Sequence, residues 1–314
     1  MASTANNPQG DRLAVDLEIS EFLIDRQARN VTPRTLHWYR YNLSVWREYL
    51  AGQDVASTHD VTPALIRRFL VHLADKNHSP GGVFNLFSSL RAFINWYAAE
   101  YAPADWENPL TRIKPPKRPT DLIEPLGLAN LQAMLKECDA KTYNGSRDAA
   151  ILLFLLDTGV RKQEFIDLNI GDVDLDAGQV RVRMGKGQKS RYVFMGNKTR
   201  RAVTVYLRRR KDKDLSTRAD APLWVVSTGK RLTPPGLREV IRRLAVRAGV
   251  TEPGLHDFRR AFAVNALRAG MDIVTLARLM GHSTLATTQR YLALVKDDLR
   301  QSHAKASPVD NLLE

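Results

Sequence analysis

The apolar and polar positions of the first hundred residues alternate with the period of a helix. Apolar residues recur at every third or fourth position in the stretches 13–30, 32–52, 62–76 and 79–101, a spacing that places them on one face. The second and third stretches open with Thr32-Pro33 and Thr62-Pro63, a typical helix N-terminus. This pattern predicts a four-helix domain over residues 12–102.

The second half of the chain contains hydrophobic patterns with the period of a helix and others with the period of a strand. Residues 128–170 are predicted to be helical, with a first cap near Asn130 and a buried helix that ends at Gly159. Residues 173–196 alternate apolar and polar positions around glycine turns, which predicts a short antiparallel sheet. Glycine-punctuated helical patterns then follow at 236–249, 256–270, 272–281 and 283–294. The expected fold is mainly α with a small antiparallel β-sheet, in two domains, the second an α+β domain over residues 126–302.

A proline-rich stretch separates these halves. Residues 103–125 contain six prolines, which rule out continuous helix or sheet and predict a semi-rigid interdomain linker. Residues 1–11 have neither the basic nor the apolar segment of a signal peptide, so we expect a disordered tail there. Residues 303–314 form a short C-terminal tail.

Positive charge is concentrated in the second domain. The net charge is +13 and the pI is near 9.9. Residues 1–123 hold 14 Lys and Arg against 13 Asp and Glu, whereas residues 124–314 hold 33 against 21. The excess favours a polyanionic partner, although a basic surface without a partner is the alternative. The basic run at 208–211 fits either a contact with a DNA backbone or a solvated helix face.

Cysteine content and hydropathy indicate the compartment. Cys138 is the single cysteine, which excludes an intramolecular disulfide and fits a reducing environment. The longest apolar run, residues 149–156, is too short to span a bilayer. We therefore expect a cytoplasmic protein with no membrane partner.

Two short stretches combine cations with groups that can orient them. In TGVRKQEF, Arg161 and Glu164 lie one helical turn apart, where a guanidinium can bind a phosphate oxygen while the carboxylate orients it. In MGKGQKSRYV, Lys186 lies between two glycines, where an ammonium can reach a minor groove and protonate a leaving oxygen. Taken singly, the first is typical of a surface ion pair and the second of a solvated turn.

Two further stretches add imidazoles and a phenol. In LHDFRRAFA, His256 lies near a helix N-terminus and Arg259 shares its face, an arrangement that suits a phosphate. In GHSTLATTQRYL, His282 lies in a turn and Tyr291 lies on the following helix. Taken singly, such a pair is more often structural, and such a tyrosine is typically half-buried core. Their convergence in one domain favours chemistry on a phosphodiester.

Together these motifs resemble those of the tyrosine recombinase, or phage integrase, family, most closely its Xer-like and integrase-like members. The matching residues are RKQE, GKGQK, HDFR, GHS and the tyrosine nine positions after the last histidine. The resemblance spans residues 13–303 and implies a SAM-like core-binding domain followed by a catalytic domain. The chain departs from the pattern at Arg260, where many members have a histidine. The resemblance assigns Tyr291 as the nucleophile, Glu164 as a supporting residue, and an activating set of Arg161, Lys186, His256, Arg259 and His282.

The chemistry explains why such a set is needed. A free tyrosine has a pKa of about 10, so the site must accept its proton or stabilise the anion. Charge that develops on the nonbridging oxygens suits the forked donors of two arginines. His256 is the candidate base and Lys186 the candidate acid for the leaving 5′ oxygen. Because cations supply the electrophilic help and a covalent 3′-phosphotyrosine retains the bond energy, we expect no metal, ATP or other cofactor.

The expected function is a site-specific DNA recombinase that cleaves and rejoins strands, in integration, excision or resolution. The alternatives are a DNA-binding regulator that has the same fold and does not cut, and an enzyme like a type IB topoisomerase or a telomere resolvase. The resemblance implies a double-stranded recombination site as partner, with a dimer per site and a homotetramer on two sites. It also implies that a C-terminal segment, here within residues 303–314, packs on a neighbouring protomer. An accessory protein or a paralogue as further partner is left open.

Overall fold

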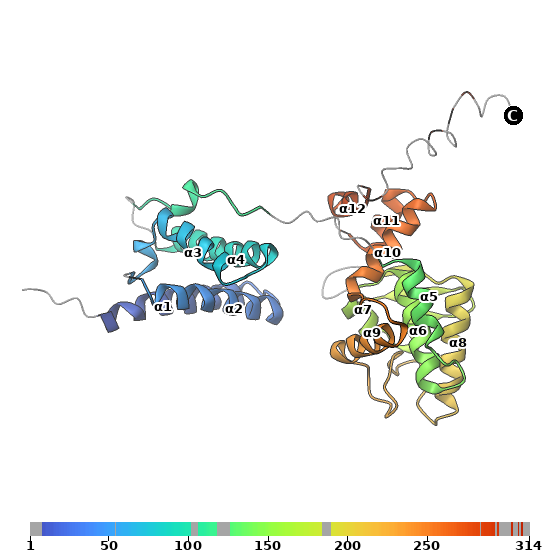
Figure 1. Ribbon diagram of the computed structural model, residues 1–314. Coiled ribbons are helices and arrows are strands. Elements are labelled where there is room, and N and C mark those ends of the chain that lie inside the picture. The colour runs from blue at the N-terminus through green and yellow to red at the C-terminus, as the bar shows by residue number, and fades with distance from the viewer. Residues whose placement is uncertain are drawn as a thin grey trace, which may run out of the picture. The chain divides into compact units, whose positions relative to one another are not determined.

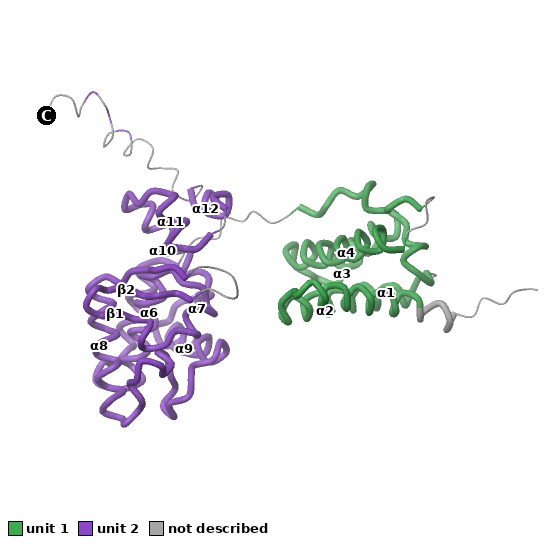
Figure 2. The backbone as a smooth tube through the Cα atoms, turned by 180° about the vertical axis from the view of Figure 1, so that it is seen from behind, with its two compact units in different colours: residues 1–121 green, residues 122–314 purple. Residues whose placement is uncertain are grey.

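The chain divides into two compact units, residues 1–121 and 122–314 (Figure 2). Each unit has a hydrophobic core of its own. Among the residues described below, no helix is both long and apolar enough to cross a membrane. The computed structural model describes residues 8–53, 55–101, 106–117, 126–183, 190–282 and 284–292, and positions 294, 303, 307 and 309.

Unit 1 contains the four helices that the apolar pattern predicts. The hydroxyls of Thr32 and Thr62 each accept a hydrogen bond of 3.2 Å from the backbone N–H three residues on, so both are N-caps. The first helix begins at Pro8, so residues 8–11 belong to it rather than to a disordered tail over 1–11. The helices are α1 (Pro8–Ala28), α2 (Pro33–Leu50), α3 (Pro63–Asp75) and α4 (Pro80–Glu100) (Figure 1).

The first part of the proline-rich stretch packs on unit 1. Ile113 is 9% exposed and belongs to the core of this unit, and the Trp106 indole donates to the carbonyl of His59 at 3.1 Å. Between them, Pro109–Arg112 form a 3₁₀ turn. The ordered part of the unit thus extends beyond the boundary at 102, because prolines interrupt helix and sheet without preventing their neighbours from packing.

Unit 2 buries one face of a small sheet in its core and leaves the other face exposed, and the predicted fold class is confirmed. The sheet has the order β1-β2-β3, antiparallel throughout, with Val180 opposite Val193. Its strands are β1 (Val173–Asp174), β2 (Gln179–Val182) and β3 (Arg191–Phe194). Its helices are α5 (Leu128–Lys136), α6 (Tyr143–Thr158), α7 (Lys162–Asp167), α8 (Asn197–Lys211), α9 (Pro234–Ala248), α10 (Leu255–Arg268), α11 (Ile273–Met280) and α12 (Leu285–Leu292).

Two details of unit 2 differ from the prediction. Asn130 lies inside α5, whose N-cap is Gly127 and has no side-chain cap bond. The basic run at 208–211 ends α8, a helix that the pattern did not reveal. Arg210 in this run is 1% exposed and donates to the carbonyls of Pro222 and Leu223. At that position the run is therefore neither a solvated face nor a surface for DNA.

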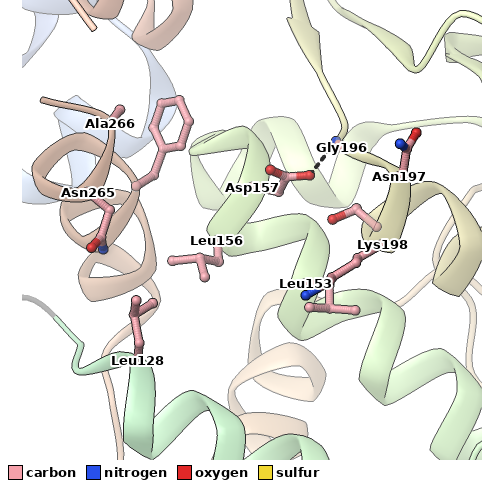
Figure 3. Close-up of a pocket in the computed structure, with 11 residues that line it drawn as sticks. Leu128, Leu153, Leu156, Asp157, Gly196, Asn197, Lys198, Asn265 and Ala266 are labelled. Atoms are coloured by element: carbon pink, nitrogen blue, oxygen red, sulfur yellow. Dashed lines mark hydrogen bonds between the residues drawn. The ribbon is translucent and has the colours of Figure 1, made fainter. Parts of the chain in front are cut away.

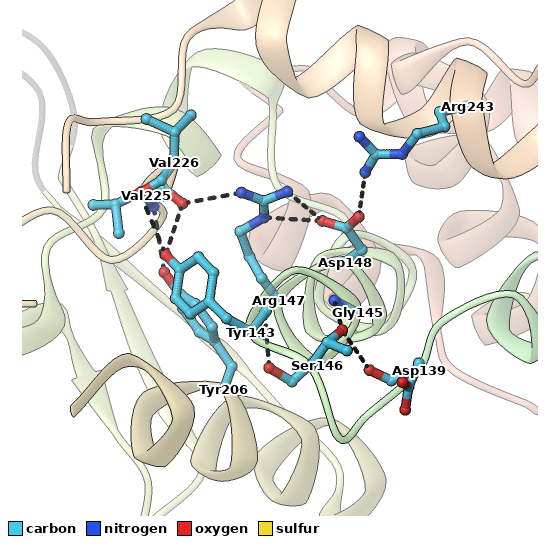
Figure 4. Close-up of polar contacts among 11 residues, drawn as sticks. Asp139, Tyr143, Gly145, Ser146, Arg147, Asp148, Tyr206, Val225, Val226 and Arg243 are labelled. Carbon is cyan, nitrogen blue, oxygen red and sulfur yellow. Dashed lines mark hydrogen bonds and ion pairs between the residues drawn. The ribbon is translucent and has the colours of Figure 1, made fainter. Parts of the chain in front are cut away.

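A buried polar cluster fixes the start of α6 (Figure 4). Arg147 and Asp148, 5% and 3% exposed, form an ion pair of 2.7 Å. Arg243 on α9 binds the second carboxylate oxygen of Asp148, and the Tyr143 hydroxyl donates to the carbonyl of Val225 at 3.1 Å. Because each buried charge has a partner, the cluster holds α6 in place. The C-terminal end of the same helix leads into the candidate active site.

Candidate active site

Arg161 lies in a tight turn between α6 and α7. Gly159 ends α6 with a φ of 56°, and a Cβ at this position would lie 2.3 Å from the ring of Phe262. Only glycine fits such a turn. Two residues on, the backbone N–H and Nη1 of Arg161 donate to the two carboxylate oxygens of Glu164 at 2.8 and 2.9 Å. The predicted pair therefore forms, and its side-chain exposures are 42% for Arg161 and 14% for Glu164.

Three arginines converge on the last turn of α11. The final carbonyls of a helix lack intrahelical partners and carry the negative end of its dipole, so they are suitable acceptors for guanidinium groups. Each of three consecutive carbonyls accepts from a different arginine: Leu279 from Arg191 at 2.8 Å, Met280 from Arg259 at 2.6 Å, and Gly281 from Arg161 at 2.7 Å.

Arg259 lies deepest among these arginines. It is 2% exposed, and its Nη1 also donates to the carbonyl of Gly159 at 2.7 Å. Burial, together with the charge of Arg161 nearby, lowers the pKa of Arg259 to about 10. Arg259 therefore remains a cation at neutral pH.

His282 follows Gly281 directly and is held on both sides of its ring. Its Nε2 lies 3.0 Å from Nη2 of Arg259, and its Nδ1 lies 2.8 Å from the hydroxyl of Thr288. A guanidinium can only donate, so Nε2 accepts and the proton belongs on Nδ1, which donates to Thr288. Burial, and then the charges of Arg259 and Arg161, lower the pKa of His282 to about 4. The ring is therefore neutral at pH 7.

Tyr291 lies on α12, the helix that follows this turn. It is 8% exposed and packs in a small cluster with Val264 of α10 and with Leu276 and Met280 of α11. The last turn of α11, which His282 follows, thus belongs to the same cluster as Tyr291.

His256 lies apart from these contacts. It occupies the first turn of α10 and is an exposed residue, and its ring forms no hydrogen bond with the described residues. Partial desolvation, and then the charges of Arg260 and Arg259, lower its pKa, which favours the neutral ring that a base requires. Arg260, at the position that departs from the family pattern, pairs with Asp257 at 3.0 Å. Lys186 lies outside the described residues.

The sequence patterns alone did not predict two residues of the site. Arg191 on β3 binds both oxygens of Glu164, at 2.8 and 2.7 Å, and Thr288 is the partner of His282. The alternating pattern of β3 predicts a strand but not its partner, and Thr288 resembles any helical threonine. Burial alone would raise the pKa of Glu164, but the hydrogen bonds from Arg191 and Arg161 lower it to about 2.

A separate cavity of about 480 Å³ lies among α5, α6, α8 and α10. Leu128, Leu153 and Leu156 give it a largely apolar wall, and Asp157 accepts from the backbone N–H of Gly196 at 2.7 Å beside it (Figure 3). None of the predicted site residues lines this cavity. Among the described residues, no group of three or more His, Cys, Asp or Glu is arranged to hold a metal ion.

Relatives of this chain are similar over nearly its whole length. It is 31% identical over 287 residues to tyrosine recombinase XerC of Oceanobacillus iheyensis, covering 90% of this chain and 93% of that protein. It is 33% identical over 282 residues to tyrosine recombinase XerC of Myxococcus xanthus, covering 88% and 92%. Among solved structures, a XerH site-specific recombinase bound to a palindromic difH substrate matches with a TM-score of 0.70 at 20% identity, covering 91% and 82%. That structural match shows the shared fold.

Family models match both halves of the chain. Residues 126–297 match the phage integrase family, and residues 19–101 match the phage integrase N-terminal SAM-like domain. These findings do not favour the DNA-binding regulator or the topoisomerase-like enzyme. The chain belongs to the phage integrase family and is a tyrosine-type site-specific recombinase.

Proposed function

We propose that Tyr291 is the nucleophile that cleaves one strand of a recombination site. Its phenolic oxygen forms a bond to phosphorus, and the bond from phosphorus to the 5′ oxygen breaks. The products are a 3′-phosphotyrosine and a free 5′ hydroxyl, and attack of another 5′ hydroxyl reverses the step. Because the phosphodiester energy stays in the covalent bond, rejoining consumes no ATP.

Arg161 and Arg259 are proposed to hold the nonbridging oxygens of the reacting phosphate. The observation that carries this proposal is their convergence on the carbonyls of residues 280 and 281, next to the helix of Tyr291. The side chain of Arg161 is 42% exposed, so N–H groups of its fork are accessible to a ligand. Neutral His282 orients Arg259 by accepting from it.

The proton transfers are assigned to His256 and Lys186. Neutral His256 takes the phenolic proton, and the ammonium of Lys186 gives a proton to the leaving 5′ oxygen. Both belong in sequence to the unit of Tyr291. His256 lies at the start of α10, and Lys186 falls in the sequence between β2 and β3. We expect cleavage to proceed in EDTA, because cations of the chain stabilise the developing charge.

A library of nicked duplexes with randomised sequence tests this proposal. Incubation in EDTA should yield DNA covalently attached to the wild-type protein and none attached to Tyr291→Phe, and the recovered DNA should share a sequence. Equal binding by both proteins, with adducts from neither, would instead indicate a protein that binds DNA without cutting it.

The assembly proposed is a dimer on each double-stranded site and a homotetramer on two sites, acting on DNA in the cytoplasm. Structures of related recombinases with DNA support the partner: one is of XerH on its difH substrate and another is of a lambda integrase dimer on a core site. In this chain we propose that residues 308–314, which include Leu312 and Leu313, pack on a neighbouring protomer.

The apolar cavity beside α5 is the candidate receptor for that segment. Leu128 at its edge is 48% exposed. Deletion of 308–314 and, separately, Leu128→Asp should both weaken tetramer assembly on DNA while leaving binding to a single site intact. Unchanged assembly after the deletion would refute a role for the segment.

A further inference from the structure

We propose that Arg191 is a positioning residue for DNA cleavage, which fixes the guanidinium of Arg161 relative to the last turn of α11. The inference rests on the proposed role of Arg161 in holding the reacting phosphate. Arg191 itself acts through Glu164 and through the α11 turn, and not on the substrate.

The contacts of Arg191 connect three segments that are distant in the sequence. Nη1 and Nη2 donate to the two oxygens of Glu164 at 2.8 and 2.7 Å, a bidentate pair, and Nε donates to the carbonyl of Leu279 at 2.8 Å. Glu164 belongs to α7, Leu279 to α11, and Arg191 opens β3. One guanidinium thus joins strand, helix and turn by the geometry that arginine provides and lysine does not.

Arg161 is linked to the same two groups. It donates to Glu164 at 2.9 Å and to the carbonyl of Gly281 at 2.7 Å. The two arginines therefore share the carboxylate of Glu164, and each donates to a different carbonyl of one turn, Arg191 to that of Leu279 and Arg161 to that of Gly281. If Arg191 is removed, both Glu164 and the α11 turn lose a hydrogen bond that fixes the distance between them. Arg161 then loses its fixed orientation.

Arg191 is more buried than Arg161, the more exposed of the two arginines proposed to hold the phosphate. Its side chain is 11% exposed, against 42% for Arg161. It also lies against the backbone of the turn, since a Cβ on Gly281 would come within 3.0 Å of its guanidinium. All three guanidinium nitrogens of Arg191 donate to Glu164 or to the Leu279 carbonyl, so this group orients its neighbours, whereas the more exposed Arg161 keeps N–H groups available for a phosphate.

The test compares single-turnover cleavage of a nicked suicide duplex by full-length variants at saturating protein. Arg191→Met should slow cleavage at least about tenfold with DNA binding unchanged, and Arg161→Ala by about a hundredfold or more. Because Arg191 acts through Arg161, the double variant should cleave no more slowly than Arg161→Ala alone. Losses that multiply in the double variant would overturn the inference.

A second substrate separates positioning from loss of structure. When a methylphosphonate replaces the reacting phosphate, one charged nonbridging oxygen is gone and the demand for a guanidinium falls. The deficits of Arg161→Ala and Arg191→Met should then both shrink. A deficit of Arg191→Met that stays the same on both substrates would show a merely structural role and overturn the inference.

A matched control is available in the same sheet. Arg181 on β2 pairs with buried Asp172, which Arg183 also binds, so Arg181→Met removes a sheet arginine away from Glu164. It should cleave at the wild-type rate.

If Arg191→Met fails to fold, Arg191→Lys keeps a cation beside Glu164 without the fork, and the same comparisons apply to it. If Arg161→Ala itself cleaves normally, the proposed role of Arg161 fails, whereas normal cleavage by folded Arg191→Met overturns only this inference.

Discussion

The buried guanidinium of Arg259 forms hydrogen bonds with two carbonyl oxygens and one imidazole nitrogen in place of water. Its partners are Gly159, Met280 and His282, the first of them 100 residues away in sequence. A buried charge of this kind is tolerated because each contact is charge-assisted. The consequence for His282 is direct: a second cation beside Arg259 is unfavourable, so the ring stays neutral.

The pH dependence of stability should report on His282. Its folded pKa of about 4 is below the ordinary 6.5, so the unfolded chain takes up this proton at higher pH than the folded chain. Protonation thus favours unfolding: the contribution of neutral His282 is fully present above about pH 6.5 and is lost as pH falls toward 4. Glu164, with a pKa of about 2, stays ionised throughout that window.

The measurement is thermal unfolding of the wild type and of His282→Gln between pH 7.5 and 4.5. Glutamine can accept from Arg259 and does not titrate. The wild type should lose Tm relative to the variant by about 2–5 °C as pH falls. Parallel curves would show that His282 titrates normally.

Residue types in the sequence indicated the chemistry but not the contacts that organise it. Arg161 and Gly281 are 120 positions apart, and Arg191 and Leu279 are 88 apart. Such pairs are set by tertiary packing, and no local spacing reports them. The sequence therefore pointed to Arg161, Glu164 and Arg259 as members of one site, while Arg191 required the fold.

At the scale of elements, glycine ends several helices in the left-handed conformation. Gly281 ends α11 with a φ of 65°, and Gly249 ends α9 with a φ of 63°. The two differ in what surrounds them. A Cβ on Gly281 would meet Arg191 at 3.0 Å, whereas a Cβ on Gly249 would meet nothing within 4 Å.

This contrast gives a matched pair of variants. Gly281→Ala and Gly249→Ala should each lower the free energy of unfolding by about 1 kcal/mol, because both force alanine into the left-handed region. Only Gly281→Ala displaces a side chain of the site, so only it should slow cleavage, by about tenfold or more. Chemical denaturation and single-turnover cleavage measure the two effects. Equal cleavage rates would contradict the close fit between Arg191 and the turn.

Elements were predictable where local signals specified them. The Thr-Pro caps of α2 and α3 and the glycine after α6 mark real helix ends. The helix α8 was not predicted from the sequence because charged residues outnumber its apolar ones. Val203 and Tyr206 are buried, but they lie in the sequence between groups of Arg and Lys residues. Buried Arg210 shows why a basic run is a poor guide to exposure.

For the whole molecule, charge predicts how binding responds to salt. The net charge is +13, and residues 124–314 carry nearly all of the excess. Contacts of Lys and Arg with phosphates release counterions, so affinity for a duplex should fall steeply with salt, by about a thousandfold between 50 and 200 mM if six or more phosphates are contacted. Fluorescence anisotropy with a labelled duplex measures this slope. A flat dependence would contradict an electrostatic interface.

The most direct test of the central claim is to identify the residue that becomes attached to DNA. Wild-type protein trapped on a suicide duplex would be digested with nuclease and trypsin, and the modified peptide sequenced by mass spectrometry. Cleavage after Arg290 and Lys296 releases the peptide YLALVK, which begins with Tyr291. A nucleotide-bearing phosphate is expected on Tyr291 in this peptide. A nucleotide on any other residue would contradict Tyr291 as the nucleophile.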